Sequence, residues 1–223
     1  KNALEKLRIS LEDSQSNQVM VDGPRVLTRI AVSTNDPTII TPVLHLMASL
    51  LVGASQRWAM ELARQCMPLQ RRKSVLVTFL EPGTGTTNAA AKVLARFIEH
   101  MTSVVFCDSF HDNDAAAFLQ VVGEGILSSS TTLIPYVSTV ASSIGTVQVC
   151  YETAEVVLRA FARFLSLIRP VMELHPSLAV KSAAYEVRDS LINTLATSDG
   201  LGEAIAHYAV APVSLGVAAR LWD

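Results

Sequence analysis

The chain has 223 residues, of which 50% are hydrophobic and 17% charged, and its formal net charge is −2. This composition provides enough apolar side chains for one sizeable core and excludes a disordered chain. Because both signs of charge are scattered along the sequence, a basic surface for nucleic acid is not expected. We expect a single helical domain over residues 1–223, and its first residue, Lys1, is compatible with a fragment of a longer protein.

The positive mean hydropathy raises the question of a membrane span. The longest apolar stretch, Ile39 to Val52, contains several polar residues and falls short of the roughly 20 residues that a spanning helix needs. The charged N-terminus shows no secretory signal. The odd number of widely spaced cysteines favours free thiols in a reducing compartment; they are Cys66, Cys107 and Cys150. We therefore expect an intracellular protein, cytoplasmic or nuclear, without a membrane association.

The first half of the chain carries several signals for helix starts. Asp36 followed by Pro37 is typical of an N-cap and a first helical residue. Ser55 can cap a helix from Gln56 to Met67, which Pro68 should end because proline cannot continue the backbone ladder. A further helix is predicted by apolar residues at the spacing of one helix face, namely Val93, Leu94, Phe97, Ile98 and Met101, with Lys92, Arg96, Glu99 and His100 on the remainder.

Helical periodicity continues through the second half. Asp112 or Asn113 can cap a helix through Ile126, in which Gly123 and Gly125 each cost about 1 kcal/mol relative to alanine. The next apolar stripe runs from Val156 to Ile168, and its helix should stop before Pro170. Ser177 can cap another helix that begins near Leu178. Three short apolar runs could form strands or the ends of helices: Ser74 to Phe79, Ser103 to Cys107 and Thr146 to Cys150.

The succession of about eight to ten amphipathic helices with short connections predicts an all-α fold. In Pro68–Met101, Tyr151–Pro170 and Ser177–Ala196 this pattern resembles armadillo and HEAT-type repeat domains. The resemblance implies antiparallel helices stacked in a superhelix, with an extended surface for a peptide or a partner helix. A non-repetitive helical bundle is the alternative, because no regular period near 40 residues can be aligned.

One glycine-rich segment, residues 82–88, suggests a second kind of function. It follows the apolar run 75–80 and precedes a helix, so it resembles the nucleotide-binding loop of AAA-type ATPases, and Val104–Asp108 resembles the acid-bearing strand of that family. However, Thr86 occupies the position where the loop needs a lysine, and Glu81 would repel phosphate. A turn followed by a helix cap is therefore favoured, while a degenerate nucleotide-binding protein stays as the alternative and predicts a parallel sheet.

Candidate catalytic and metal sites are weak. The segment Asp108–Asp114 holds several carboxylates and His111, but it lacks the glycine and glutamate positions of a calcium loop and is predicted to be a solvated loop. No Gly-x-Ser-x-Gly pattern occurs. We therefore predict neither catalytic residues nor a metal or cofactor, and no enzyme activity.

The predicted function is a protein-interaction or scaffolding module that presents a helical groove to a peptide or partner helix. The partner-binding candidates are the arginines and the tryptophan of the predicted helix Gln56–Met67 and the basic residues that follow Pro68, since arginine and tryptophan are common interface anchors; they are Arg57, Trp58, Arg64, Arg71, Arg72 and Lys73. A solvated basic face and a core tryptophan are the structural alternatives. A self-associating structural protein of nucleoprotein or capsid type is the remaining functional alternative.

Overall fold

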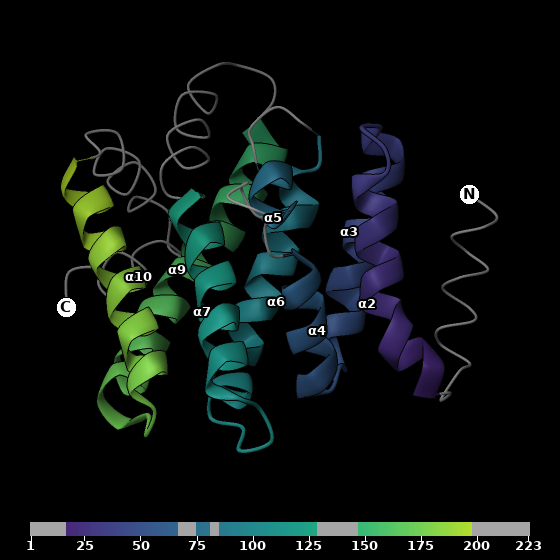
Figure 1. The fold of residues 1–223 in the computed structure, drawn as a ribbon. Coiled ribbons are helices and arrows are strands. Elements are labelled where there is room, and N and C mark those ends of the chain that lie inside the picture. Colours follow the sequence, from purple (N-terminus) through teal and green to yellow (C-terminus); the bar gives the residue numbers. More distant parts are fainter. Residues whose placement is uncertain (1–16, 67–74, 81–84, 129–146, 198–223) are drawn as a thin grey trace.

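Every regular element in the part of the chain that the computed structural model describes, residues 17–66, 75–80, 85–128 and 147–197, is a helix (Figure 1). The all-α prediction is confirmed. None of these helices is both long enough and apolar enough to cross a lipid bilayer. In chain order they are α2 (Asn17–Val32), α3 (Pro37–Val52), α4 (Gln56–Cys66), α5 (Val75–Phe79), α6 (Thr87–Val105), α7 (Asp112–Ser128), α9 (Val147–Leu174) and α10 (Leu178–Thr197).

The helices pack in two layers. In one layer α2 contacts α4, α4 contacts α7, and α7 contacts α10; in the other, α6 lies between α3 and α9. The layers meet where α2 packs on α3, α4 and α7 pack on α6, and α10 packs on α9. Successive helices therefore alternate between the layers, apart from the short α5, and this arrangement is compatible with a helical-repeat architecture. The second-layer helices begin at Pro37, Thr87 and Val147, at unequal separations, which is why no regular period can be aligned.

Local capping chemistry explains several helix starts. The carboxylate of Asp36 accepts a hydrogen bond from the Thr38 amide at 2.9 Å, with Pro37 at the first helical position, as predicted. The Ser55 hydroxyl accepts from the Trp58 amide at 3.3 Å at the start of α4. The cap predicted at Asp112 or Asn113 is wrong by one or two residues, because α7 already begins at Asp112. Its first turn is closed by the backbone carbonyl of the preceding residue.

The short apolar runs are helical rather than extended. Val75–Phe79 forms α5, residues 103–105 end α6, and Val147–Cys150 begins α9. The strand alternative is therefore wrong, and the parallel sheet required by the nucleotide-binding hypothesis is not formed by these segments. The cap residue of α6 is Thr86, but its hydroxyl donates to the Phe79 carbonyl at 3.0 Å instead of accepting from the helix. Residues 82–84 of the glycine-rich segment lie outside the described residues.

The prediction that a helix ends before Pro170 is wrong, because α9 continues through this residue to Leu174. Proline removes one backbone donor, but the helix beyond it is held by tertiary contacts: Val171 is buried and His175 bonds to the end of α6. Pro24 and Pro42 likewise lie inside α2 and α3. Burial of an apolar face thus outweighs the local preference of proline at these positions.

The core is centred on α6, whose buried face packs against helices of both layers. Phe97 of α6 meets Phe118 of α7 edge to face, with ring centroids 5.9 Å apart. Complete burial of side chains of this size stabilises the fold by about 1.5–3 kcal/mol each. The predicted apolar face of this helix is confirmed, since all five of its residues are buried; they are Val93, Leu94, Phe97, Ile98 and Met101.

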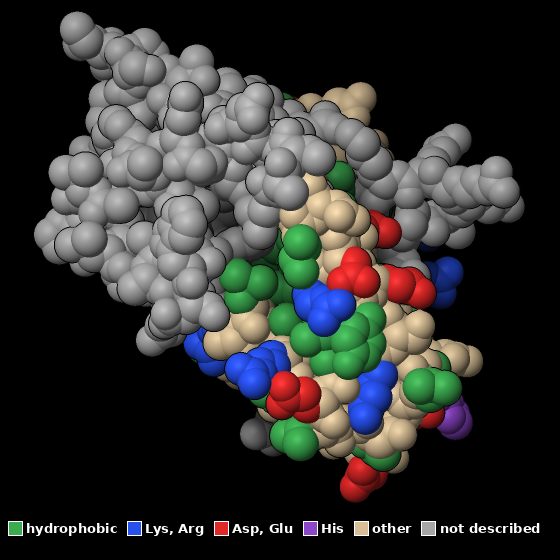
Figure 2. Space-filling model, turned by 90° about the vertical axis from the view of Figure 1, so that its left-hand side faces the viewer, with side chains coloured by type: hydrophobic (Ala, Val, Ile, Leu, Met, Phe, Trp, Pro, Cys, Tyr) green, Lys and Arg blue, Asp and Glu red, His purple; other side chains and the backbone are tan. Residues whose placement is uncertain are grey.

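Among the described helices, α10 lies at one end of the stack (Figures 1 and 2). Leu178, Tyr185 and Ile192 are exposed there at seven-residue intervals. Charged residues separate them, and the Arg188 guanidinium lies 4.8 Å from the centre of the Tyr185 ring while it bonds to Asp189. Figure 2 shows hydrophobic and charged side chains interspersed on this end of the molecule.

Candidate functional site

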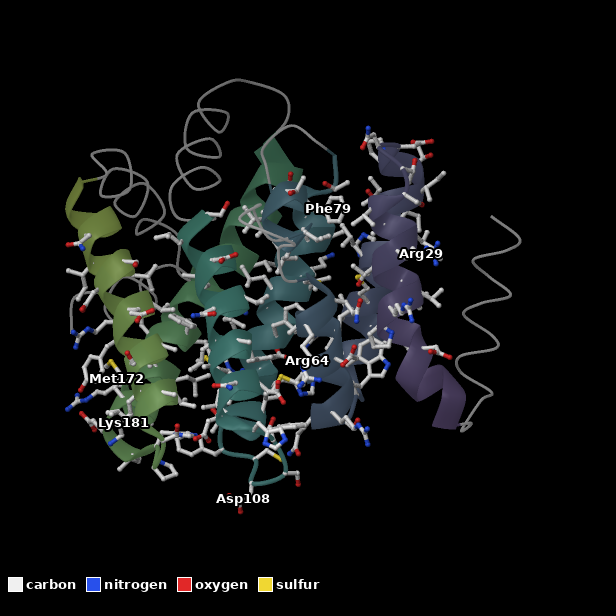
Figure 3. The ribbon with its side chains drawn as sticks, in the orientation of Figure 1. Arg29, Arg64, Phe79, Asp108, Met172 and Lys181 are labelled. Atoms are coloured by element: carbon white, nitrogen blue, oxygen red, sulfur yellow. The ribbon has the colours of Figure 1, made fainter. Side chains whose placement is uncertain are left out.

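Three of the predicted partner-binding residues lie on α4, in the layer that also contains α2, α7 and α10 (Figure 3). Arg57 is exposed, as an interface residue should be. Trp58 is only 4% exposed and packs beside Gly23 of α2, which agrees with the alternative of a core tryptophan. Their role in partner binding stays a prediction, and the other three candidates, Arg71, Arg72 and Lys73, lie outside the described residues.

Arg64 links α4 to α7 through ion pairs. Its guanidinium contacts the carboxylate of Asp114 and, at 3.4 Å, that of Glu61, and these contacts raise the pKa of the arginine. The Asp108–Asp114 segment therefore uses its last carboxylate to hold a neighbouring helix, while Asp108 lies exposed at the tip of the loop (Figure 3). Over the described residues, no group of three or more potential metal ligands comes together.

The thiols of Cys66 and Cys107 are free, as the sequence predicts. Burial raises the pKa of Cys66 to about 12, so this thiol stays protonated and is a poor nucleophile. The Cys107 thiol is partly exposed and donates to the side-chain oxygen of Gln56 at 3.4 Å. Cys66 therefore acts as a small core residue of α4.

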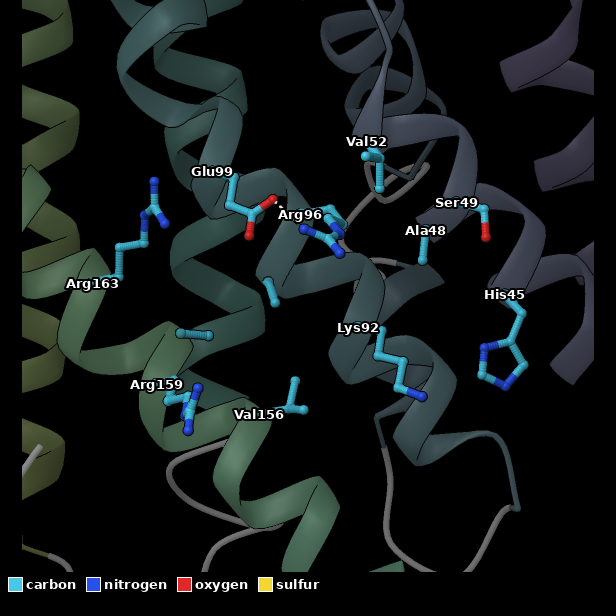
Figure 4. A pocket seen from close by; sticks show the side chains of 12 residues that line it. His45, Ala48, Ser49, Val52, Lys92, Arg96, Glu99, Val156, Arg159 and Arg163 are labelled. Carbon is cyan, nitrogen blue, oxygen red and sulfur yellow. Dashed lines mark hydrogen bonds and ion pairs between the residues drawn. The ribbon is translucent and has the colours of Figure 1, made fainter. Parts of the chain in front are cut away.

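A recessed groove lies on the other layer, across α3, α6 and α9 (Figure 4). Its volume is about 640 Å³, and α6 lies between the two flanking helices. Each helix contributes four side chains, one helical turn or less apart. The lining residues are His45, Ala48, Ser49 and Val52 of α3, Lys92, Ala95, Arg96 and Glu99 of α6, and Val156, Arg159, Ala160 and Arg163 of α9.

Positive charge dominates this groove. Lys92 and Arg96 are four residues apart on α6, and Arg159 and Arg163 are four residues apart on α9, so each pair shares one face of its helix. Glu99 is the one carboxylate among the lining residues, and it accepts a hydrogen bond from Arg96 at 2.6 Å. The described lining residues therefore include four cations and one carboxylate, whereas the whole chain carries a net charge of −2.

His45 responds to this positive environment. Its pKa lies below the ordinary value, first because the imidazole is partly buried and second because Lys92 repels a positive charge on it. The structure places His45 at the α3 wall of the groove (Figure 4). A bound anion would favour the charged imidazole and oppose both effects.

Small and apolar side chains leave room beside the charges. Ala48 and Ser49 on α3, Ala95 on α6 and Ala160 on α9 are the short side chains of the lining. Val52, at the edge of the groove, is 64% exposed. The groove therefore combines an apolar surface of modest size with cations from two helices, which suits an anionic segment of a larger molecule.

The groove was not predicted from the sequence. The cation pairs are visible as neighbouring turns of two amphipathic helices, but solvated faces of surface helices show the same pattern. The two cation pairs line one groove because α9 packs beside α6, and these helices are far apart in the sequence. Comparisons with protein-family models, curated proteins and solved structures found no match to this chain.

Proposed function

We propose that this protein is a non-enzymatic interaction module of the armadillo and HEAT type, which holds a segment of a partner protein in the groove between α3, α6 and α9. The observation that carries the proposal is the convergence of Lys92, Arg96, Arg159 and Arg163 on one recessed groove. Electrostatic complementarity would select a partner segment with acidic character and steer its approach.

The arrangement of the helices in two layers supports this proposal. In helical-repeat proteins, equivalent helices of successive repeats form an extended binding surface. Here α6 lies between α3 and α9, which is compatible with such a row. Because a fold alone does not imply a function, the weight rests on the lining residues. The short side chains of Ala48, Ala95 and Ala160 would let a peptide or a helix approach the backbone closely.

Reversal of the groove charge tests the proposal. The double variant Arg159→Glu/Arg163→Glu should weaken a purified partner's binding about tenfold or more, because two attractive contacts become repulsive. Arg169→Glu is the matched control, since Arg169 lies on the same helix, is highly exposed and pairs with Glu173 away from the groove. The partner is first captured with the wild-type protein, and affinities are then measured by calorimetry with purified components.

The two variants separate a groove effect from a general effect of charge. The proposal requires the partner to bind Arg169→Glu as tightly as the wild type and to bind the groove variant weakly. Equal affinity for the wild type and the groove variant would place the binding surface elsewhere, and Arg57→Glu would then test the exposed face of α4.

A further inference from the structure

Among the described helices, α2 and α10 form the two ends of the first layer (Figure 1). Within this layer α2 contacts α4, α4 contacts α7, and α7 contacts α10. Because successive long helices alternate between the two layers, α2 and α10 run in the same direction along the stack (Figure 1). In a helical-repeat array each unit packs only on its neighbours. The outer faces of α2 and α10 are therefore the positions at which a further unit would continue the row.

The outer face of α2 carries a stripe of exposed residues. Arg25, Arg29 and Val32 are exposed at spacings of four and three residues, which places them on one side of the helix. Leu27 and Ala31 are fully buried on the opposite side. Figure 3 shows that the side chain of Arg29 points away from the rest of the stack. The helix thus presents two guanidinium groups and one apolar side chain at this end of the molecule.

The outer face of α10 carries a stripe with the same spacing. Tyr185, Asp189 and Ile192 are exposed at intervals of four and three residues, and Leu191 is buried on the opposite side. Asp189 already accepts two hydrogen bonds from Arg188, and both end on the same oxygen, Oδ1. A carboxylate has a second oxygen that can accept from another guanidinium. Asp189 can therefore bind a second arginine while it keeps its contact with Arg188.

We propose that α2 of one molecule packs head to tail on α10 of a second copy of this chain. Two helices that run in the same direction and carry stripes of equal spacing can be aligned in one register. This register places Arg29 opposite Asp189 of the second copy and Val32 opposite its Ile192. Opposite charges then meet across the contact, and the two apolar side chains remove each other from water.

Pairing of two identical α2 faces fits these residues less well, because it would bring Arg25 and Arg29 of both copies together. A head-to-tail contact leaves one end of each complex available, so association continues beyond the dimer unless a ring closes. The contact lies in the layer opposite the groove of α3, α6 and α9. The inference is therefore independent of the proposed function, and an assembly of this kind would present several grooves in a row.

Sedimentation velocity of the full chain between about 1 and 100 µM tests the proposal. The wild type should show a sedimentation coefficient that rises with concentration beyond the value of a dimer. Arg29→Asp and Asp189→Arg should each weaken this self-association about tenfold or more. Asp108→Arg is the matched control, because Asp108 is exposed on the loop between α6 and α7, away from both end helices (Figure 3).

Charge exchange gives the decisive comparison. An equimolar mixture of Arg29→Asp and Asp189→Arg should associate again, because one contact then has the native pair and the next has the exchanged pair. The double variant Arg29→Asp/Asp189→Arg should associate on its own for the same reason. If a single variant loses its helical circular dichroism, Arg29→Gln and Asp189→Asn replace the charge reversals and should weaken association in the same way.

Three outcomes would overturn the proposal. A monomer at every concentration would mean that a second copy does not occupy these faces. Association that Asp189→Arg weakens and Arg29→Asp leaves unchanged would indicate a contact between two α10 helices instead. Loss in both single variants without recovery in the mixture would show that Arg29 and Asp189 do not meet across the contact.

Discussion

Two glycines in the middle of α7 bring neighbouring helices close to its backbone. A Cβ atom at Gly123 would lie 2.6 Å from Cγ1 and 3.2 Å from Cβ of Val187 on α10. At Gly125 it would lie 2.7 Å from Cδ1 of Leu94 on α6. From the sequence, both glycines are predicted only to weaken the helix, because the contacts that require them involve distant parts of the chain. Gly123 is the stricter of the two, since a β-branched valine cannot easily turn away.

The variant Gly123→Ala should therefore be less stable than the wild type. Overpacking costs about 1–3 kcal/mol, and the higher helix propensity of alanine offsets about 1 kcal/mol of this cost. Gly53→Ala is the control: no atom lies within 4 Å of the new Cβ and φ is −111°, so its effect should stay within about 0.5 kcal/mol. Urea denaturation followed by circular dichroism measures both. A Gly123→Ala variant as stable as the wild type would mean that α10 can move away from α7 at little cost.

At the scale of helices, the end of α9 is fixed by a buried histidine. His175 is 5% exposed, and its Nδ1 accepts a hydrogen bond from the Ser177 amide at 3.1 Å. Because a backbone amide can only donate, the ring proton is on Nε2, which donates to the Val105 carbonyl at 2.9 Å. One side chain thus joins the last turn of α9 to the end of α6 and to the start of α10. It also explains why the helix continues beyond Pro170.

Replacement of this histidine should have a large effect for a single side chain. His175→Ala removes both hydrogen bonds and leaves a buried carbonyl of α6 without its partner, which should cost about 1–3 kcal/mol. His111→Ala is the matched control, because His111 is exposed. Urea unfolding of the two variants gives the comparison. Equal loss in both, or no loss in His175→Ala, would show that the end of α9 is held by apolar packing alone.

The elements that sequence analysis predicted well are those defined by local chemistry. Asp36 and Ser55 act through amides two or three residues away, so their caps are visible in the sequence. The apolar face of α6 follows from helical spacing in the same way. Pro170 was misjudged because its local effect is opposed by contacts with α6. The groove was missed for the same reason, since it depends on which helices become neighbours.

At the scale of the whole molecule, the groove is lined by residues from three helices that are neighbours in space. In the sequence, helices of the other layer lie between them. His45 reports on the electrostatics of this assembly because Lys92, on a different helix, contributes to its lowered pKa. In the unfolded chain this influence is absent. The folded protein therefore binds fewer protons than the unfolded chain between the folded-state pKa of His45 and its ordinary value of about 6.5.

The sign of the resulting pH dependence follows from this difference. The contribution of His45 to stability is fully present above pH 6.5 and is lost as the pH falls toward the folded-state pKa, because protonation then favours the unfolded chain. Binding of an anionic segment should act in the opposite direction, since negative charge beside Lys92 raises the pKa of the imidazole. Acidification should thus lower the stability of the free protein. It should also increase the contribution of His45 to the binding of an anionic segment.

The pH dependence of stability and the effect of a bound anion on the pKa of His45 can both be measured, with His45→Gln as the reference variant. Urea unfolding between pH 7.5 and the folded-state pKa should show a decline in wild-type stability that is smaller in His45→Gln. An NMR titration of the His45 ring protons, with and without a peptide of the captured partner's acidic segment, should show a higher pKa in the complex. A peptide that binds without moving this pKa would occupy another surface, because no anion can enter the groove without changing the field at His45.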